Sequence, residues 1–231
     1  MAAKNSVKQY IDHSYYHLYN RGIEKQDIFR DEMDYRVFLL YLKQYLEPKD
    51  TLNLQKIITS KDIPWSEKNT AVKLLRLNNF YDTIQLYTYC LMPNHFHFLL
   101  KQTDAMSIDV FMNSLCSRYT GFLNKKYHRV GPMFQGPYKA VLIESDEQLL
   151  QVHRYIHRNA QSLSFLQDNV LKRFEQYPYS SYADYIGTRD TKWIHMDVIH
   201  SFFKNRRESY VEFMRQNEHV WYQKDYYLDN E

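Results

Sequence analysis

The stretch CLMPNHFHFLL, residues 90–100, decides the fold of this chain. Successive side chains of a β-strand point to opposite faces, so a strand here would place His95 and His97 on one face and Phe96 and Phe98 on the other. Two imidazoles on one face can ligate a divalent metal when another element supplies a third ligand. The alternative is a pair of hydrogen-bonded histidines on a half-exposed strand.

The flanking sequence predicts alternating strands and helices. We expect strands over residues 13–20, 83–92, 95–101 and 139–144, and helices over about 32–47, 107–128 and 147–160. Asp31 is the expected N-cap of the first helix, and Ser145 or Asp146 that of the third. Pro93-Asn94 is a turn signal that joins two strands into an antiparallel hairpin. This order predicts an α+β fold, a ferredoxin-like or RRM-like antiparallel sheet with helices packed on one face.

We divide the 231 residues into a main domain over 10–190 and a C-terminal helical extension over 191–231. An insertion of about 49–80 interrupts the main domain, with a short helix expected over 67–77. The extension is expected to hold short helices around 196–204 and 206–217, and a tyrosine-rich connector, 177–182, precedes it.

Composition is ordinary for a soluble protein, with 44% hydrophobic and 25% charged residues. The net charge of +3 is too small to indicate a nucleic-acid partner by itself. The two cysteines, Cys90 and Cys116, lie in apolar stretches, which is typical of reduced thiols. The sequence shows neither a run of about 20 apolar residues nor the apolar core of a signal peptide. We therefore expect a cytoplasmic protein without a membrane partner.

The segment 117–139 is basic and rich in aromatic residues. It holds five Lys or Arg, no Asp or Glu, and five aromatic rings: Tyr119, Phe122, Tyr127, Phe134 and Tyr138. Cations for phosphates and rings for bases are typical of surfaces that bind single-stranded nucleic acid. The alternative is a solvated helix end followed by an ordinary loop.

The predicted helix 147–160 carries a second set of polar residues. Tyr155 and Asn159 lie one turn apart at the border of its apolar stripe, and Arg154 and Arg158 form a similar pair beside them. This set suits phosphodiester transfer, with Tyr155 as covalent nucleophile, a metal on His95, His97 and Asn159, and the arginines holding the strand. The alternative is a boundary aromatic and a helix-end polar residue. His17, on the first strand, is at most a neighbour of the metal ligands.

Five motifs, taken together, resemble the HUH-type single-tyrosine transposases, and most closely the REP-associated tyrosine transposases of the IS200-like family. They occupy residues 19–22 with 26–29, 91–97, 131–136, 154–159 and 177–182. Their order is kept over about 19–187, and a Pro-Asn-His-x-His followed at this distance by Arg-Tyr-Ile-His-x-Asn is a specific combination.

The resemblance implies cleavage of single-stranded DNA beside a hairpin, a Mg²⁺ or Mn²⁺ ion and a 5′-phosphotyrosine intermediate. It implies that His95 and His97 are the HUH pair, Tyr155 the nucleophile and Asn159 the third metal ligand. The basic segment and the helix arginines become DNA-binding candidates: Arg118, Lys125, Lys126, Arg129, Lys139, Arg154 and Arg158. Two departures are Ala160, where a proline commonly ends the helix, and Pro137, where a basic residue is common.

Three rival interpretations stay open at the level of sequence. One is another HUH nuclease, of the replication-initiation or relaxase type. Another is a hairpin-binding or single-stranded-DNA-binding protein of the same fold that has lost catalysis. The third is a plain RRM-like RNA binder. A monomer and a homodimer are both compatible with the motifs, and in a dimer Tyr155 could serve the metal site of the partner.

Overall fold

The computed structural model describes residues 10–163, 176–204 and 206–216, so the end of the predicted C-terminal extension lies outside the described residues. Within them the α+β prediction is confirmed. Four strands form an antiparallel sheet in the order β2-β3-β1-β4. They are β1 (Tyr15–Arg21), β2 (Ile84–Met92), β3 (His95–Gln102) and β4 (Lys139–Ile143). This spatial order is that of the ferredoxin-like plan.

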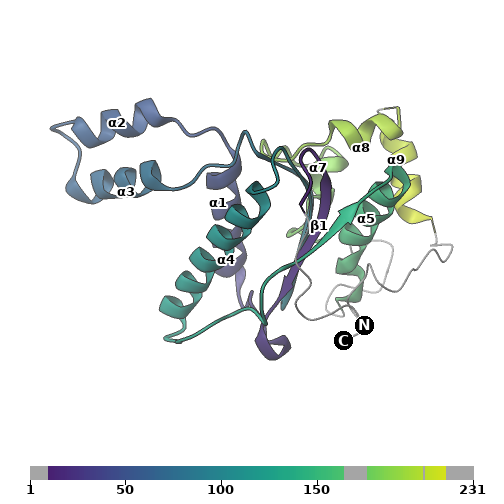
Figure 1. The fold of residues 1–231 in the computed structure, drawn as a ribbon, viewed down its shortest axis with the longest axis horizontal. Helices are drawn as coiled ribbons and strands as arrows, with labels where there is room; N and C mark the ends of the chain where they lie inside the picture. Colours follow the sequence, from purple (N-terminus) through teal and green to yellow (C-terminus); the bar gives the residue numbers. More distant parts are fainter. Residues whose placement is uncertain (1–9, 164–175, 205, 217–231) are drawn as a thin grey trace.

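Helices α1 (Glu32–Leu46) and α4 (Ser107–Lys126) cover one face of the sheet (Figure 1). Asp31 caps α1 as predicted, because its side chain accepts a hydrogen bond from the Asp34 backbone N–H. Phe38 of α1 packs on Phe96 and Phe98 of β3, with ring centroids 5.4 and 6.2 Å apart. The phenylalanines of the HFHF stretch therefore form the apolar core beneath α1.

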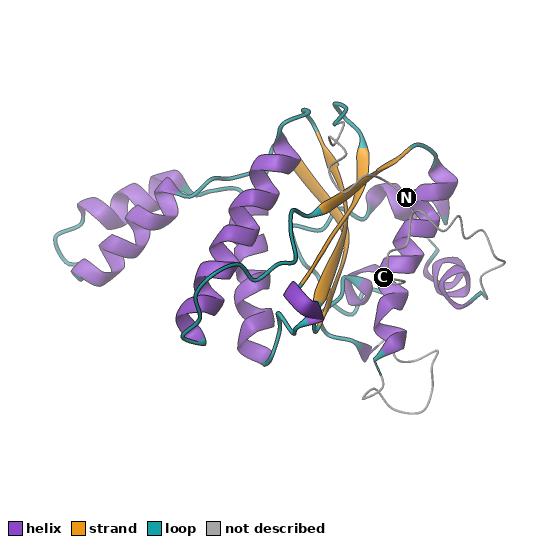
Figure 2. Cartoon of the chain, turned by 60° about the horizontal axis from the view of Figure 1, so that its bottom comes forward, coloured by secondary structure: helices purple, strands orange, loops and turns teal. Residues whose placement is uncertain are grey.

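Helix α5 (Asp146–Arg158) packs against β2 and β3 from the opposite face (Figures 1 and 2). Ser145 caps it through the Gln148 N–H. The prediction of helices on one face thus holds for α1 and α4 and is wrong for α5. The physical reason is that β2 and β3 carry large side chains on both faces, so the second face also needs a cover.

The predicted insertion forms two antiparallel helices, α2 (Thr51–Thr59) and α3 (Trp65–Arg76), that project from the body (Figures 1 and 2). The helix expected over 67–77 corresponds to α3, whereas α2 was not expected. Among the residues of these two helices, Ala71 is the one that is buried. The pair therefore contributes little to the core of the molecule.

The described part of the C-terminal region packs along β2. It contains α7 (Tyr182–Tyr185), α8 (Asp197–Phe202) and α9 (Arg207–Arg215), and the last two correspond to the two short helices expected there. Isolated bridges join Ser180 to Cys90 and Ile194 to Leu86. The Tyr185 hydroxyl donates to the Tyr87 carbonyl at 2.9 Å. This region consequently covers the edge of the sheet at β2.

Both cysteines are free, with Cys90 buried and Cys116 partly buried. No helix in the described part of the chain is long and apolar enough to cross a membrane.

Candidate active site

The two histidines of the PNHFH motif lie on β3, one of the two central strands of the sheet. His95 begins the strand opposite Met92 of β2, and His97 pairs with Tyr19 of β1. Their ring centroids are 5.0 Å apart. His97 is 3% exposed and Phe96 is fully buried. The alternation predicted from the sequence is therefore present, with the histidines on the face that α5 covers.

Asn94 fixes the tautomer of the neutral His95 ring, that is, which ring nitrogen carries the proton. The Asn94 amide nitrogen donates to the Lys25 carbonyl, which orients its oxygen toward His95. That oxygen lies 2.6 Å from His95 Nδ1 and can only accept, so Nδ1 carries the ring proton of the neutral imidazole. The Nε2 atom of His95 then presents a lone pair, which is the form that ligates a metal. Asn94 was not predicted as a site residue from the sequence. Its position directly before His95 was the signal that could have identified it.

His17 of β1 holds His97 from the neighbouring strand. His17 Nε2 and His97 Nδ1 are 2.9 Å apart, and the two rings stack with centroids 5.2 Å apart. Burial lowers the pKa of His17 to about 3. Burial, followed by the charges of His95, His17 and Arg21, holds the pKa of His97 well below its ordinary value. Both rings are therefore neutral near pH 7, and one donates to the other.

His97 Nε2 is the second candidate ligand atom. It is buried and has no hydrogen-bond partner among the described residues. When His97 donates through Nδ1 to His17, its Nε2 carries a lone pair, as Nε2 of His95 does. Hydrogen bonding of the other ring nitrogen by a neighbouring group is the usual way in which proteins orient metal-binding histidines. His17 thus occupies the position of an orienting neighbour.

Tyr155 comes to this place from α5. Its ring lies edge-on to both imidazoles, with centroids 5.5 Å from His97 and 5.8 Å from His17. Tyr155 is 9% exposed and Asn159 is 8% exposed, so both are more buried than their border position on the helix predicts. Packing of α5 on the sheet thus brings together three side chains that are up to 138 positions apart in the chain.

Asn159 follows the last residue of α5 and begins a 3-10 turn, η2 (Asn159–Ser162). The turn continues the chain helically where relatives commonly have a proline. The Asn159 amide nitrogen donates to the Tyr155 carbonyl at 3.0 Å, which leaves the amide oxygen as an acceptor. The described residues contain no group of three or more His, Cys, Asp or Glu side chains that could hold a metal ion. A metal on His95 and His97 would therefore need an amide or substrate oxygen to complete its ligands.

The helix arginines contact the C-terminal region. The Arg154 guanidinium lies 4.6 Å from the centre of the Phe213 ring and donates to the Phe213 carbonyl. Arg158 donates to the side chain of Gln161 and the carbonyl of Gln216. Arg154 is 6% exposed. A DNA contact by Arg154, as the sequence predicts, would require these contacts with α9 to open.

Two cations of the basic segment connect helices on the other face of the sheet. Arg118 lies 3.7 Å from the Tyr41 ring centre and donates to Gln44, both on α1. Lys126 pairs with Asp31 and Asp34, each at 2.7 Å. Both belong to α4, whereas Tyr155 and His97 face α5. Arg118 and Lys126 therefore stabilise the α1–α4 pair and do not face the histidines.

The other basic-segment residues that were predicted to contact DNA lie in three different places. Lys125 is exposed at the end of α4, and half-buried Arg129 donates to the Met133 sulfur. Lys139 is exposed on β4 and pairs with Tyr19, which in turn pairs with His97. Directly paired residues of a sheet point to the same face. Among the predicted cations of the basic segment, Lys139 is thus the one in register with the histidines.

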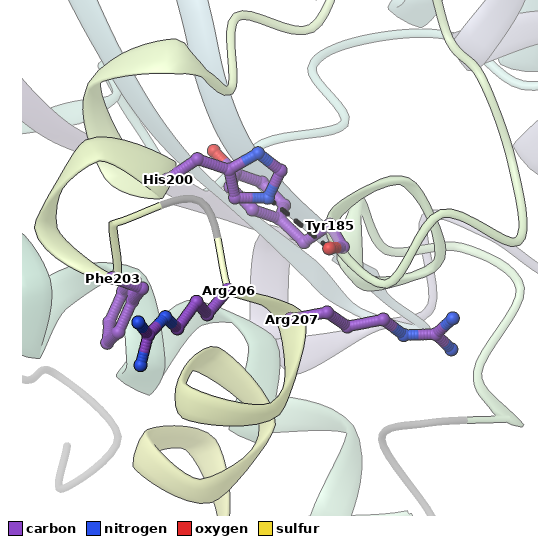
Figure 3. A pocket seen from close by; sticks show the side chains of 5 residues that line it. All are labelled: Tyr185, His200, Phe203, Arg206 and Arg207. Atoms are coloured by element: carbon purple, nitrogen blue, oxygen red, sulfur yellow. Dashed lines mark hydrogen bonds between the residues drawn. The ribbon is translucent and has the colours of Figure 1, made fainter.

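Figure 3 shows a pocket of about 60 Å³ lined by Tyr185, His200, Phe203, Arg206 and Arg207. The His200 ring nitrogen and the Tyr185 carbonyl lie 3.3 Å apart at its wall. A volume of that size accommodates a few water molecules and is far below the roughly 300 Å³ of a typical small-molecule site. The pocket is also formed by α7, α8 and α9 and does not include the histidine–tyrosine cluster.

Comparison with known proteins gives independent information on the class of protein to which this site belongs. A family model described as "Transposase IS200 like" matches residues 67–159, a stretch that contains His95, His97, Tyr155 and Asn159. The resemblance inferred from the motifs is thereby confirmed over this stretch of the chain. No curated protein matches the chain.

Two solved structures are similar to the chain. One is a REP-associated tyrosine transposase bound to a REP hairpin, with 11% identity, a TM-score of 0.48, and coverage of 83% of this chain and 97% of that one. The other is a protein described as a transposase from Deinococcus radiodurans R1, with 18% identity, a TM-score of 0.28, and coverage of 66% and 95%.

Proposed function

We propose that this protein nicks and rejoins single-stranded DNA at hairpin-flanked sites, through a 5′-phosphotyrosine on Tyr155. The observation that carries the proposal is the packing of α5, which sets the Tyr155 ring 5.5 Å from the His97 ring on the same covered face of the sheet. The family match over residues 67–159 supports it independently. Because both rings come from one chain, the arrangement favours a site assembled within a single subunit.

The covalent step exchanges one phosphodiester for another. The Tyr155 oxygen attacks phosphorus and loses its proton, the bond from phosphorus to the 3′-oxygen breaks, and that oxygen takes up a proton as it leaves. The energy of the broken bond is kept in the phosphotyrosine. A free 3′-hydroxyl can therefore reverse the attack and join strands without a nucleotide cofactor.

Two imidazole nitrogens and an amide oxygen are donor atoms that a divalent ion accepts. His95 Nε2, His97 Nε2 and the Asn159 amide oxygen would hold Mg²⁺ or Mn²⁺, which when bound acts as a Lewis acid on the phosphate. Asn94 and His17 keep the two imidazoles in the form that presents Nε2. Burial of His97 and Tyr155 excludes water, which strengthens electrostatic interactions and disfavours hydrolysis of the phosphotyrosine. We assign the enzyme to the cytoplasm, because its proposed DNA substrate is found there and because cysteines stay reduced there.

A denaturing gel tests the proposal. The protein is incubated with end-labelled single-stranded DNA carrying hairpins from the repeats of its own genome, with Mn²⁺ or with a chelator. We expect a label that migrates with the protein, is lost with the chelator, and falls at least about 10⁴-fold in Tyr155→Phe. The Tyr155→Phe protein should bind the same DNA as the wild type does.

Two outcomes would overturn parts of this proposal. Binding without any adduct across the whole panel would favour the catalytically silent DNA-binding protein. Cleavage that survives Tyr155→Phe would mean that activated water, and not Tyr155, is the nucleophile.

A further inference from the structure

The projecting helix pair carries a net positive charge. Residues 49–77, which we call the arm, hold six Lys or Arg and three Asp or Glu, a net charge of +3. The whole chain has 30 basic and 27 acidic residues, so the other 202 residues carry 24 of each sign. The net charge of the arm therefore equals that of the whole protein, and the rest of the chain is neutral in sum.

None of the six cations of the arm has an acidic partner among the described residues. Lys49, at the root, donates to the carbonyls of Leu75 and Leu77. The other five form none of the ion pairs found among the described residues; they are Lys56, Lys61, Lys68, Lys73 and Arg76. Lys56, Lys73 and Arg76 lie in last helical turns, where the helix dipole accounts for a cation. Lys61 lies between the two helices, so the helix dipole does not account for its charge.

Trp65 stands out at the tip of the arm. It is the first residue of α3, directly after the segment that joins the two helices, and it is 76% exposed. Lys61 lies in that same joining segment. A solvent-exposed indole beside unpaired cations is the combination with which proteins stack an unpaired base and hold its phosphates. The other strongly exposed apolar side chain of the arm, Leu52, is 70% exposed near the root.

We propose that the arm is a second nucleic-acid contact, in which Trp65 stacks on an unpaired base and Lys61 and its neighbours contact phosphates. The occupant is a polyanion with unstacked bases, which under the proposed function is the single-stranded flank or loop of the DNA hairpin. Charge argues against a second copy of this chain, because two arms repel one another and the rest of the chain is neutral overall. The assignment of the DNA hairpin as the occupant rests on the proposed function. The expected affinity of the arm for single strands does not.

The test measures binding of full-length protein to labelled dT30 at several salt concentrations. Two triple variants are compared: Lys56→Gln/Lys61→Gln/Lys73→Gln in the arm, and Lys43→Gln/Lys192→Gln/Lys204→Gln in the body as a charge-matched control. Losing three phosphate contacts should reduce the slope of log affinity against log salt by about 2. The body control should keep the wild-type slope.

Trp65→Ala is compared with Leu52→Ala, which removes another exposed apolar side chain of the same arm. Loss of one stacked base should weaken dT30 binding between about 5-fold and 150-fold, whereas Leu52→Ala should bind as the wild type does. Circular dichroism checks that each variant keeps its helices. Equal slopes for the two triple variants, or equal affinities for the two alanine variants, would sink the proposal.

The gel with the hairpin DNA separates this proposal from the proposed function. A normal adduct in the wild type together with normal dT30 binding by the arm variants would overturn the arm proposal alone. Weakened binding by the arm variants with no adduct in any protein would support the arm and overturn the phosphotyrosine mechanism.

Discussion

The two faces of the one sheet differ in chemistry although the same strands build both. Beneath α1 and α4, Phe96 and Phe98 pack on Phe38, and all three are fully buried. Beneath α5, His97 of the same strand meets His17 and Tyr155. A strand alternates its side chains, so the HFHF stretch supplies core and candidate chemistry from adjacent residues. The comparison teaches that neighbouring residues of one strand contribute to the apolar core on one face and to the candidate active site on the other.

On the polar face, the buried histidines of α5 take part in a hydrogen-bonded network that the apolar face does not need. His153 of α5 binds Thr88 at 2.6 Å and the Tyr210 hydroxyl at 3.0 Å. His157, one turn later, binds Ser181 at 2.8 Å. Burying polar groups costs free energy unless each finds a partner. These contacts fix α5, and with it Tyr155, over the histidines of the sheet.

The largest expected effect on stability lies on the apolar face. Phe98→Ala should lower the free energy of unfolding by about 3–5 kcal/mol, because it leaves a cavity beside Phe38 and Phe96. Urea unfolding followed by circular dichroism measures this. Leu40→Ala, at a position of α1 that is 47% exposed, should cost less than about 1 kcal/mol. A small effect of Phe98→Ala would mean that the apolar face is not the main source of stability.

The second largest effect is expected on the polar face of the sheet. His17→Gln removes the imidazole that hydrogen-bonds His97, and loss of such an orienting partner should weaken Mn²⁺ binding about 10-fold to 100-fold. Isothermal titration calorimetry at pH 7.5 measures the affinity. Phe98→Ala, assayed where it is still folded, should bind Mn²⁺ as the wild type does. Unchanged affinity in His17→Gln would show that His17 does not orient a metal ligand.

The smallest effect concerns pH. Burial, and secondarily the charge of His200, lowers the pKa of His153 to about 3. Below its ordinary pKa of about 6.5 the unfolded chain takes up a proton that the folded protein does not. Stability is therefore lost as the pH falls below about 6.5, and His153 alone should account for about 1.4 kcal/mol between pH 7.5 and 5.5.

Urea unfolding at pH 7.5 and pH 5.5 checks this prediction, with His153→Gln as the comparison. The other buried histidines also contribute to the loss in the wild type, so the informative quantity is the difference between the two proteins. The variant should lose about 1.4 kcal/mol less than the wild type between the two pH values. An identical loss in both would mean that His153 is protonated in the folded state.

Local signals in the sequence predicted much of the fold. Asp31 was expected to cap α1 and does so; Ser145 or Asp146 was expected to cap α5, and Ser145 does so. Capping can be predicted because it depends on residues three positions apart. The strand order followed from the sequence of elements. The helix α2 was not predicted, although Leu54, Ile57 and Ile58 stand at helical spacing and Asp50 caps the helix; it buries no residue of its own.

The cation predictions show where local reasoning stops. Arg118, Lys126 and Arg154 were expected to contact DNA, yet their contacts in the fold are with Tyr41, Asp34 and Phe213. Each partner lies at least 59 positions away in the chain. A charge count over a short segment does not reveal such partners.

By itself, the sequence determined that His95 and His97 share a face of a strand and that Tyr155 and Asn159 share a helix turn. The periods of 2 and 3.6 residues are local properties of the backbone. The tertiary structure alone decided that α5 covers the histidine face, that His17 holds His97, and that Lys139, rather than Arg118 or Lys126, is in register with the site. Those arrangements depend on which large side chains remain uncovered when the sheet forms, and packing between distant residues settles that.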